Sequence, residues 1–279
     1  MNIVISGLGV MGASLALAIK HSGLDAVVQG YDKPPILNQA YELQIIDEKI
    51  IHWPFDAENA DVIFLATPIH IIKKHLLDLN SIVHKNTVIT DLGSTKSEIE
   101  DYTRKIGFKG TYVGSHPMTG AEKSGLKAAN QLLYENAIYI LTGNKDNLPK
   151  NVSEKLIPVL EAVKARIFVL NADEHDRIMA LISHLPQVIA VALMNIVGEK
   201  KSNLNYCFDL AAGGFRDLTR IASSSSKIWQ DIMLSNKSNI EEAIDGFVEE
   251  LLYEKKKPLE PLRKILSRNM RYLSARTAG

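Results

Sequence analysis

The sequence predicts an α/β domain with a mainly parallel sheet over residues 1–170, followed by an all-helical domain over residues 171–279. Two observations lead to this prediction. Up to about residue 170, short apolar runs alternate with segments of helical period, a pattern typical of a parallel sheet with helical crossovers. After Asn171 the strand signal stops and only helical patterns follow.

Seven short runs rich in apolar and β-branched residues are predicted to be strands. They are Asn2–Ser6, Ala26–Tyr31, Val62–Ala66, Thr87–Thr90, Tyr112–Gly114, Ala137–Leu141 and Arg166–Leu170. Because strands joined by helical crossovers run parallel, their carboxyl ends should meet at one edge of the sheet. Ligands of open α/β sheets bind at that edge, so polar residues there are the first candidates for a functional site.

The second half of the chain is predicted to begin with one long helix. Apolar residues recur three and four positions apart from Ile178 to Ile196, and Pro186 should open this helix locally beside Ser183 and His184. Further helical patterns cover Phe215–Ser223, Ser226–Ser235, and Asn239 to about Leu273. Several of these patterns carry apolar residues on more than one face, which predicts a homodimer through the helical domain.

Composition narrows the class of protein. Lysine and arginine together number 32, as do aspartate and glutamate, so no overall field draws the chain to nucleic acid or to a membrane surface. The single cysteine, Cys207, excludes an intrachain disulfide and offers no metal cluster. No apolar run free of polar residues approaches the roughly 20 needed to cross a bilayer. We therefore expect a soluble, cytoplasmic protein without a metal site.

A glycine-rich segment follows the first predicted strand. Gly7-Leu8-Gly9-Val10-Met11-Gly12 fits G-x-G-x-x-G, opens the helix containing Ala13–Lys20, and lies 20 residues before Asp32, at the end of the second strand. This unit predicts a Rossmann-type domain, in which a pyrophosphate binds at the helix N-terminus. A carboxylate at Asp32 would bind ribose hydroxyls and repel a 2′-phosphate, so NAD is expected and NADP is less favoured, although Lys33 keeps NADP open. The alternative is that the glycines serve only a packed turn.

Three polar or rigid residues follow later strands. Thr67 and Pro68 come after the strand Val62–Ala66, and Ser94 follows the strand Thr87–Thr90. All three are placed at carboxyl ends of strands, where they could line the nicotinamide half of a dinucleotide cleft. Ordinary strand-to-helix turns, with Ser94 as a helix cap, remain the alternative.

Histidine and arginine residues suggest a reaction. An alcohol that loses hydride to NAD must also lose a proton, and a neutral histidine can accept it. His116 follows the predicted strand Tyr112–Gly114 and is the leading candidate for this base. The alternatives are that His184 is the base or that His116 is only a turn residue. Arg216 and Arg220 lie four apart and could bind a carboxylate, unless they form surface pairs. The other histidines considered are expected to be solvated: His21, His52, His70, His75 and His84.

Six segments, in this order, resemble the prephenate/arogenate dehydrogenases of tyrosine biosynthesis. They are GLGVMGASLA, ATPIH, TDLGSTKSEI, GSHPMTGAEKSG, EHDRIMALISHLPQ and GGFRDLTRIASSSSKIWQDI, and they span almost the full chain. The resemblance implies an oxidoreductase that transfers hydride from C4 of a cyclohexadienol to nicotinamide, passes the C4 hydroxyl proton to a histidine, and releases carbon dioxide as the ring becomes aromatic.

The resemblance also assigns residues. It implies that His116 is the catalytic base, that Ser94 hydrogen-bonds the histidine or the substrate hydroxyl, and that Arg220 clamps the ring carboxylate. Further substrate-pocket positions carried over from the family are Ser183, His184, Glu122, Gly213 and Trp229, with Trp229 near a neighbouring subunit. Gln187 stands where many relatives have a second histidine, close to the substrate side chain. This departure leaves the side-chain preference open between pyruvyl and alanyl; prephenate is the expected substrate and arogenate the alternative.

Two other functions fit parts of the sequence. The β-hydroxyacid dehydrogenases share G-L-G-x-M-G, but they place a lysine on a helix where this chain has none between Arg177 and Lys200. A nucleotide-sensing or scaffolding dimer without turnover would keep the same fold. Only the combination of His116, Ser94 and Arg220 argues for an enzyme over that second alternative.

Overall fold

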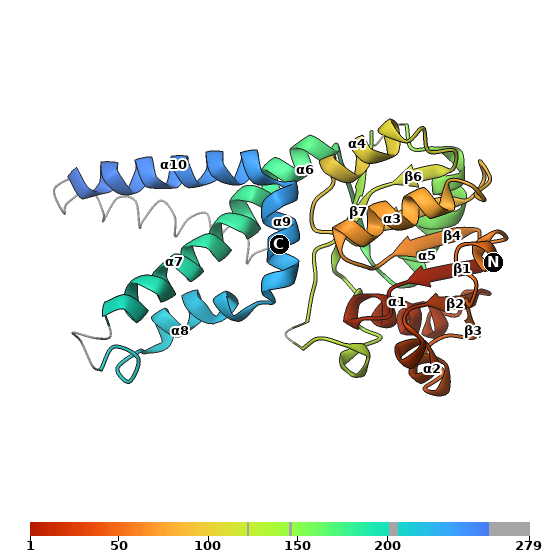
Figure 1. Cartoon of the computed structure of the whole chain (residues 1–279), viewed down its shortest axis with the longest axis horizontal. Helices are drawn as coiled ribbons and strands as arrows, with labels where there is room; N and C mark the ends of the chain where they lie inside the picture. Colours follow the sequence, from red (N-terminus) through yellow and green to blue (C-terminus); the bar gives the residue numbers. More distant parts are fainter. Residues whose placement is uncertain (122, 145–146, 201–205, 257–279) are drawn as a thin grey trace.

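The computed structural model describes residues 1–121, 123–144, 147–200 and 206–256. Within them, six parallel strands form the main sheet, in the order β3-β2-β1-β4-β5-β6 (Figure 1). The strands are β1 (Asn2–Ser6), β2 (Val27–Tyr31), β3 (Glu48–Lys49), β4 (Val62–Leu65), β5 (Val88–Asp91) and β6 (Thr111–Val113). The sheet is parallel as the sequence predicts, and β3 is a short edge strand that the sequence pattern does not show.

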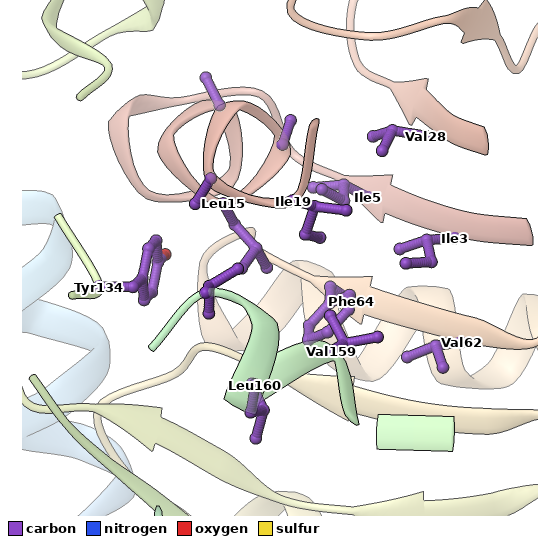
Figure 2. Close-up of a cluster of buried hydrophobic side chains, with 14 of the residues drawn as sticks. Ile3, Ile5, Leu15, Ile19, Val28, Val62, Phe64, Tyr134, Val159 and Leu160 are labelled. Carbon is purple, nitrogen blue, oxygen red and sulfur yellow. The ribbon is translucent and has the colours of Figure 1, made fainter. Parts of the chain in front are cut away.

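Helices cover both faces of this sheet. They are α1 (Val10–His21), α2 (Pro34–Glu42), α3 (Ile69–Leu79), α4 (Ser97–Lys105) and α5 (Ile157–Ala162), with short segments η1 (Phe55–Ala57), η2 (Leu126–Ala128) and η3 (Val152–Leu156). Successive strand residues point to opposite faces, so alternate residues join different cores. One core holds Ile3, Ile5, Leu15, Phe64 and Val159 (Figure 2). The other holds Val4, Ile63, Ile72, Leu76 and Ile99.

A second, three-stranded sheet contains β7 (Ser115–Pro117), β8 (Ile138–Thr142) and β9 (Arg166–Leu170). β7 runs antiparallel to β8, and β8 runs parallel to β9. The chain passes from the first sheet to the second at Gly114, where a Cβ atom would lie 2.8 Å from the Thr142 hydroxyl oxygen. His116 therefore lies within a strand, opposite Ile140, and not in the turn after a strand that the sequence pattern suggests.

The rest of the described chain is helical. It contains α6 (Ala172–Met179), η4 (Ala180–His184), α7 (Leu185–Lys200), α8 (Gly213–Thr219), η5 (Arg220–Ser223), α9 (Ser226–Ser235) and α10 (Lys237–Lys256). The segment η4 is π-helical, and Pro186 just beyond it cannot donate a backbone hydrogen bond, which confirms the expected opening near Ser183 and His184. The expected helix beyond residue 256 lies outside the described residues.

The helical part reaches away from the sheets. In Figure 1, α6 and α9 lie beside the N-terminal domain, while α7, α8 and α10 extend outward from it. One helical run of the described chain, Ala172–Glu199, is long and apolar enough to cross a membrane: an 18-residue window within it has a mean hydropathy of 1.8, and 22% of that window is buried. Leu181, Ile182 and Ile196 on this run are each more than half exposed. The single chain thus leaves a large apolar surface uncovered.

Candidate active site

The glycine-rich turn has the geometry that dinucleotide binding needs. Gly7 has φ +97°, and a Cβ atom there would lie 2.5 Å from the Ala66 carbonyl oxygen. A Cβ on Gly12 would lie 1.9 Å from the carbonyl oxygen of Gly7, so both positions require glycine for packing. A Cβ on Gly9 would meet nothing within 4 Å. Gly9 therefore leaves open space directly at the N-terminus of α1, where no side chain caps the free backbone N–H groups.

A cavity of about 320 Å³ opens at this turn. Its walls come from the start of α1, the β4–α3 and β5–α4 turns, and α9; they include Gly9, Val10, Met11, Thr67, Pro68, Ser94, Ile228 and Ile232. The hydroxyl oxygen of Thr67 is buried and has no hydrogen-bond partner among the described residues. A buried polar atom is costly to leave unpaired, so the cavity wall offers a bond that only a bound molecule or water could complete. The residues present therefore fit a dinucleotide.

Asp32 lies where the sequence predicts the ribose-binding carboxylate. It follows β2, and its Oδ2 accepts a hydrogen bond from the backbone N–H of Leu8, 2.6 Å away. Its Oδ1 accepts from the backbone N–H of Lys33 at 2.6 Å. Leu8 itself is buried in the core and does not line the cavity. The carboxylate is thus fixed against the glycine-rich turn.

A second cavity, of about 400 Å³, lies next to the first. The N-terminal domain contributes Ser94, His116, Pro117, Met118 and Thr119, and the helical part contributes Ser183, Ile228, Trp229 and Ile232. Four residues that the sequence singles out are brought together here: His116, Ser94, Ser183 and Trp229. Ser94, Ile228 and Ile232 line both cavities, so the two cavities are neighbours across one shared wall.

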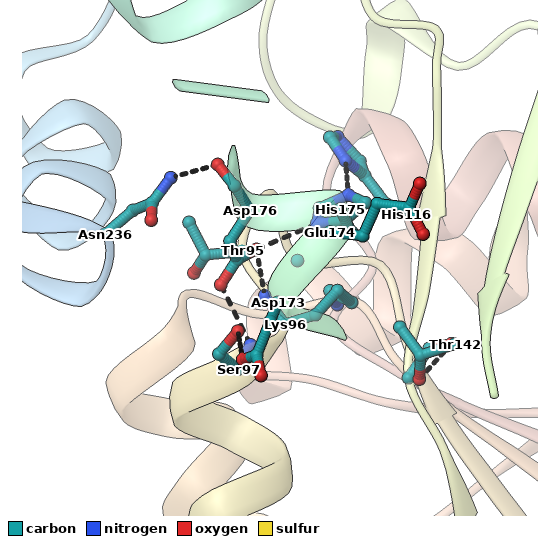
Figure 3. Close-up of polar contacts among 12 residues, drawn as sticks. Thr95, Lys96, Ser97, His116, Thr142, Asp173, Glu174, His175, Asp176 and Asn236 are labelled. Carbon is teal, nitrogen blue, oxygen red and sulfur yellow. Dashed lines mark hydrogen bonds and ion pairs between the residues drawn. The ribbon is translucent and has the colours of Figure 1, made fainter. Parts of the chain in front are cut away.

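His116 begins a buried chain of side chains, shown in Figure 3. Its Nδ1 lies 2.9 Å from Nε2 of His175, and Nδ1 of His175 lies 2.8 Å from Oδ1 of Asp176. Burial lowers the pKa of His116 well below the ordinary value of 6.5, and the charges of His175, Lys96 and His184 act in the same direction. Although its edge reaches the cavity, protein surrounds the ring. His116 is therefore neutral at neutral pH and able to accept a proton.

Two residues of this hydrogen-bonded series, His175 and Asp176, are not predicted by the sequence pattern. His175 and Asp176 are both buried, and Asp176 accepts hydrogen bonds from the backbone N–H groups of Lys96 (2.8 Å) and Ser97 (2.9 Å), ahead of α4. Burial raises the pKa of Asp176, but the hydrogen bond from His175 and these two backbone bonds outweigh it and keep the pKa low. The sequence shows only that a histidine and an aspartate are adjacent near the start of the long helical run. That pair alone does not predict contacts with residues far away in the sequence.

His184 and Gln187 lie behind the second cavity. Both are buried; the His184 ring stands edge-on to Trp229 with centroids 5.9 Å apart, and its Nδ1 lies 3.2 Å from Nδ2 of Asn236. Burial lowers the pKa of His184 to about 4. The side-chain oxygen of Gln187 is buried and has no hydrogen-bond partner within the described part of the chain. Neither residue lines the cavity, but His184 packs against Trp229, which does.

The remaining candidates are not brought to His116 within one chain. Arg220 begins η5 and Gly213 begins α8, and both are exposed and absent from the walls of the two cavities. Glu122 lies outside the described residues. The roles that the resemblance implies for these three residues therefore stay predictions.

Comparison with known proteins agrees with the two-part fold. The family model described as "Prephenate dehydrogenase, nucleotide-binding domain" matches residues 15–169, and the one described as "Prephenate dehydrogenase, dimerization domain" matches residues 171–258. A prephenate dehydrogenase of Lactococcus lactis subsp. cremoris is 37% identical over 90% of this chain and 69% of its own length.

Two solved structures extend the comparison. Prephenate dehydrogenase from Aquifex aeolicus, in complex with hydroxyphenyl propionate and NAD+, superposes with a TM-score of 0.86 at 30% identity, covering 100% of this chain and 97% of that one. An arogenate dehydrogenase from Synechocystis has a TM-score of 0.79 at 26% identity, covering 100% and 98%. With both domain models matched in order along a chain that carries the dinucleotide turn and the His116 cavity, the protein belongs to the prephenate dehydrogenase family.

Proposed function

We propose that this chain is an NAD-dependent enzyme that converts prephenate to 4-hydroxyphenylpyruvate and carbon dioxide. The same chemistry on arogenate, yielding tyrosine, is the alternative, and the similarity to an arogenate dehydrogenase supports keeping it. The observation that carries the proposal is the cavity of His116 and Ser94, joined through a shared wall to a cavity built for a dinucleotide. The similar Aquifex aeolicus enzyme, solved in complex with hydroxyphenyl propionate and NAD+, supports the choice of cofactor and substrate.

His116 is assigned the proton transfer. NAD+, when bound, accepts the hydride that leaves C4 of the substrate ring. Neutral His116 accepts the proton of the C4 hydroxyl, while the bond between the ring and its carboxylate breaks and leaves its electron pair in the ring. The immediate products are an aromatic phenolate, carbon dioxide, reduced cofactor and a protonated His116. Return of that proton from His116 to the phenolate oxygen gives the phenol and restores the neutral base. Ser94, which lines both cavities, is assigned to hydrogen-bond His116 or the reacting hydroxyl.

The substrate carboxylates need cationic or polar partners. Arg220 is assigned to the ring carboxylate, because a guanidinium can donate two parallel hydrogen bonds to it. Ser183 and Trp229 already line the cavity, and Gln187 is assigned to the end of the pocket that takes the substrate side chain. Its side-chain oxygen has no hydrogen-bond partner among the described residues and suits the ammonium group of arogenate, a donor that the pyruvyl side chain of prephenate lacks. We also assign to the substrate pocket Glu122, His184 and Gly213.

The helical domain is assigned to dimer formation. The matched family model is described as a dimerization domain, and only 22% of an 18-residue apolar window within Ala172–Glu199 is buried in one chain. Covering such a surface with a second copy stabilises both by roughly 25 cal/mol per Å² of apolar area buried. A homodimer also offers a route for residues outside the cavity of one chain to reach the cavity of the other. Cytoplasmic location is our further expectation, consistent with a single cysteine.

A direct assay tests this function. Purified protein is incubated with NAD+ and either prephenate or arogenate, and the absorbance of the reduced cofactor and the release of carbon dioxide are followed together. We expect equal amounts of both products with at least one substrate. A His116→Asn variant should lower kcat by roughly 10²- to 10⁴-fold with a modest change in substrate binding. Turnover of neither substrate, or near-normal turnover by the variant, would contradict the proposal.

A further inference from the structure

The hydrogen-bond chain behind His116 determines where protons can sit. Asp176 is held as a carboxylate, because it accepts two backbone N–H bonds and its pKa is lowered. A carboxylate can only accept, so the 2.8 Å contact requires a proton on Nδ1 of His175. In neutral His175 the other ring nitrogen, Nε2, then carries a lone pair and must accept.

The same reasoning passes to the next ring. Nε2 of His175 lies 2.9 Å from Nδ1 of His116, so Nδ1 of His116 must donate. Neutral His116 then has no proton on Nε2, the nitrogen left for a molecule in the cavity that its ring lines. Reversing any one proton in this chain would place two donors or two acceptors against each other inside the protein. Such a mismatch is costly because all of His175 and nearly all of Asp176 are buried.

We propose that His175 and Asp176 are positioning residues that hold His116 in the tautomer with Nε2 unprotonated toward the substrate. The proposal rests on the assignment of His116 as base in the proposed function. Neither residue lines the cavity or touches a reacting atom; they act through His116. Their contribution is to make the neutral base present its lone pair to the substrate, with no need to exchange tautomers before each turnover.

Asp176 also ties this tautomer to the contact between the two domains. Its carboxylate holds the backbone ahead of α4 in the N-terminal domain, and its carbonyl oxygen accepts a 2.8 Å hydrogen bond from Nδ2 of Asn236, between α9 and α10. Thr95 and Ser235 bridge the same junction, with hydroxyl oxygens 2.8 Å apart. The acceptor for His116 is therefore supplied by α6 only when the helical domain is docked in this position.

Two substitutions of His175 separate positioning from packing. His175→Leu removes the acceptor and keeps an apolar side chain of similar size, whereas His175→Gln keeps a side-chain oxygen that can accept from Nδ1 of His116. His84→Leu is the matched control, because His84 is an exposed histidine that lines neither cavity. Each variant is checked for folding by circular dichroism, and kcat and KM are measured with NAD+ and prephenate. Tautomers are read from long-range proton–nitrogen NMR spectra of ¹⁵N-histidine-labelled protein, with His116→Asn identifying the His116 signals.

We expect wild-type His116 to be protonated on Nδ1 and free on Nε2. His175→Leu should lower kcat by about tenfold or more with KM values within about twofold, and should show His116 in both tautomers. His175→Gln should recover most of kcat and the single tautomer, and His84→Leu should match the wild type. Protonation of wild-type His116 on Nε2 would overturn the proposal, as would equal kcat losses in the Leu and Gln variants or no loss in either.

The spectra also separate this proposal from the proposed function, because they need no turnover. If the wild type oxidises neither prephenate nor arogenate but His116 carries its proton on Nδ1, the assigned activity fails and the tautomer assignment stands. If turnover is normal and His116 carries its proton on Nε2, the reverse holds.

Discussion

The ammonium group of Lys96 donates a hydrogen bond to the carbonyl oxygen of Ser115, 2.7 Å away, directly before His116 in the chain. Lys96 is fully buried and forms an ion pair with Asp91, which also accepts a 2.6 Å hydrogen bond from the Tyr112 hydroxyl. A fixed, buried cation therefore lies close to the proposed base. Its field opposes a second positive charge on His116 and adds to the effect of burial.

The pH dependence of the reaction should reflect this environment. Because the pKa of His116 lies well below 6.5, the base is neutral above that pH and becomes protonated only as the pH falls through the lowered value. We expect kcat/KM to stay level from neutral pH down past 6.5 and to fall only below it. The profile of kcat/KM for prephenate at saturating NAD+ measures this, since it reports ionisations of the free enzyme. If kcat/KM of the wild type begins to fall above pH 6.5, and only His116→Asn removes this fall, the assignment of a depressed pKa to His116 is contradicted.

The proposed carboxylate clamp predicts different effects for two neighbouring arginines. Arg220→Ala should raise KM for prephenate roughly 30-fold or more, because removing one partner of a desolvated charge pair costs several kcal/mol. Arg216→Ala is the matched control, one helical turn earlier and equally exposed, and should change KM by less than about threefold. Steady-state kinetics at saturating NAD+ gives both values. If KM rises in Arg216→Ala and not in Arg220→Ala, the ring carboxylate is bound by Arg216 and not by Arg220.

Cofactor preference should depend on Asp32. Asp32→Asn removes the negative charge that repels a 2′-phosphate, so the ratio of kcat/KM for NADP+ to that for NAD+ should rise about tenfold or more, equivalent to about 1.4 kcal/mol. Asp25→Asn, at an exposed carboxylate before β2, is the control and should leave the ratio unchanged. Measuring initial rates with both cofactors decides the point. An unaltered ratio in Asp32→Asn would show that another residue sets the preference.

The dimer can be tested on the exposed face of α7. Ile196 is 58% exposed in the single chain, and Ile196→Arg should shift the protein toward monomer, because a charge is costly to bury in an apolar interface. Leu77→Arg on α3 is the control, since Leu77 is 54% exposed but lies on the N-terminal domain. Size-exclusion chromatography with light scattering gives the mass of each variant. A wild-type monomer, or dissociation caused equally by both substitutions, would exclude this interface.

The sequence predicted the parts of the site that depend on local pattern. The glycine turn, Asp32 and the strand-end residues Thr67 and Ser94 follow from the alternation of strands and helices, because parallel strands bring their carboxyl ends together. The meeting of His116 with Ser183 and Trp229 was expected only through the family resemblance. No local pattern could show it, because the residues come from separate domains.

Side-chain partners were the main omissions. His175 is separated from His116 by 59 residues, and nothing in the spacing of a helix start predicts that distant contact. His75 was expected to be solvated, which is wrong: it is buried, lies 2.9 Å from the Ser6 hydroxyl oxygen, and packs against Tyr31 and Trp53. The inward face of α3 includes Ile72, Leu76 and Leu79, and His75 shares it. The polar side chain of His75 suggests exposure, but its position in the helical period of α3 predicts burial, and burial is what the structure shows.

Helix α9 supplies Ile228 and Ile232 to both cavities, and Ser94 faces them from the other domain. Any shift of α9 that admits one molecule therefore reshapes the space left for the other. Thermodynamic linkage then makes the effect reciprocal: the factor by which NAD+ changes the dissociation constant of the substrate equals the factor by which substrate changes that of NAD+. A substitution at Ile228 consequently alters two affinities at once, and its effect has to be measured around the full cycle of binary and ternary complexes.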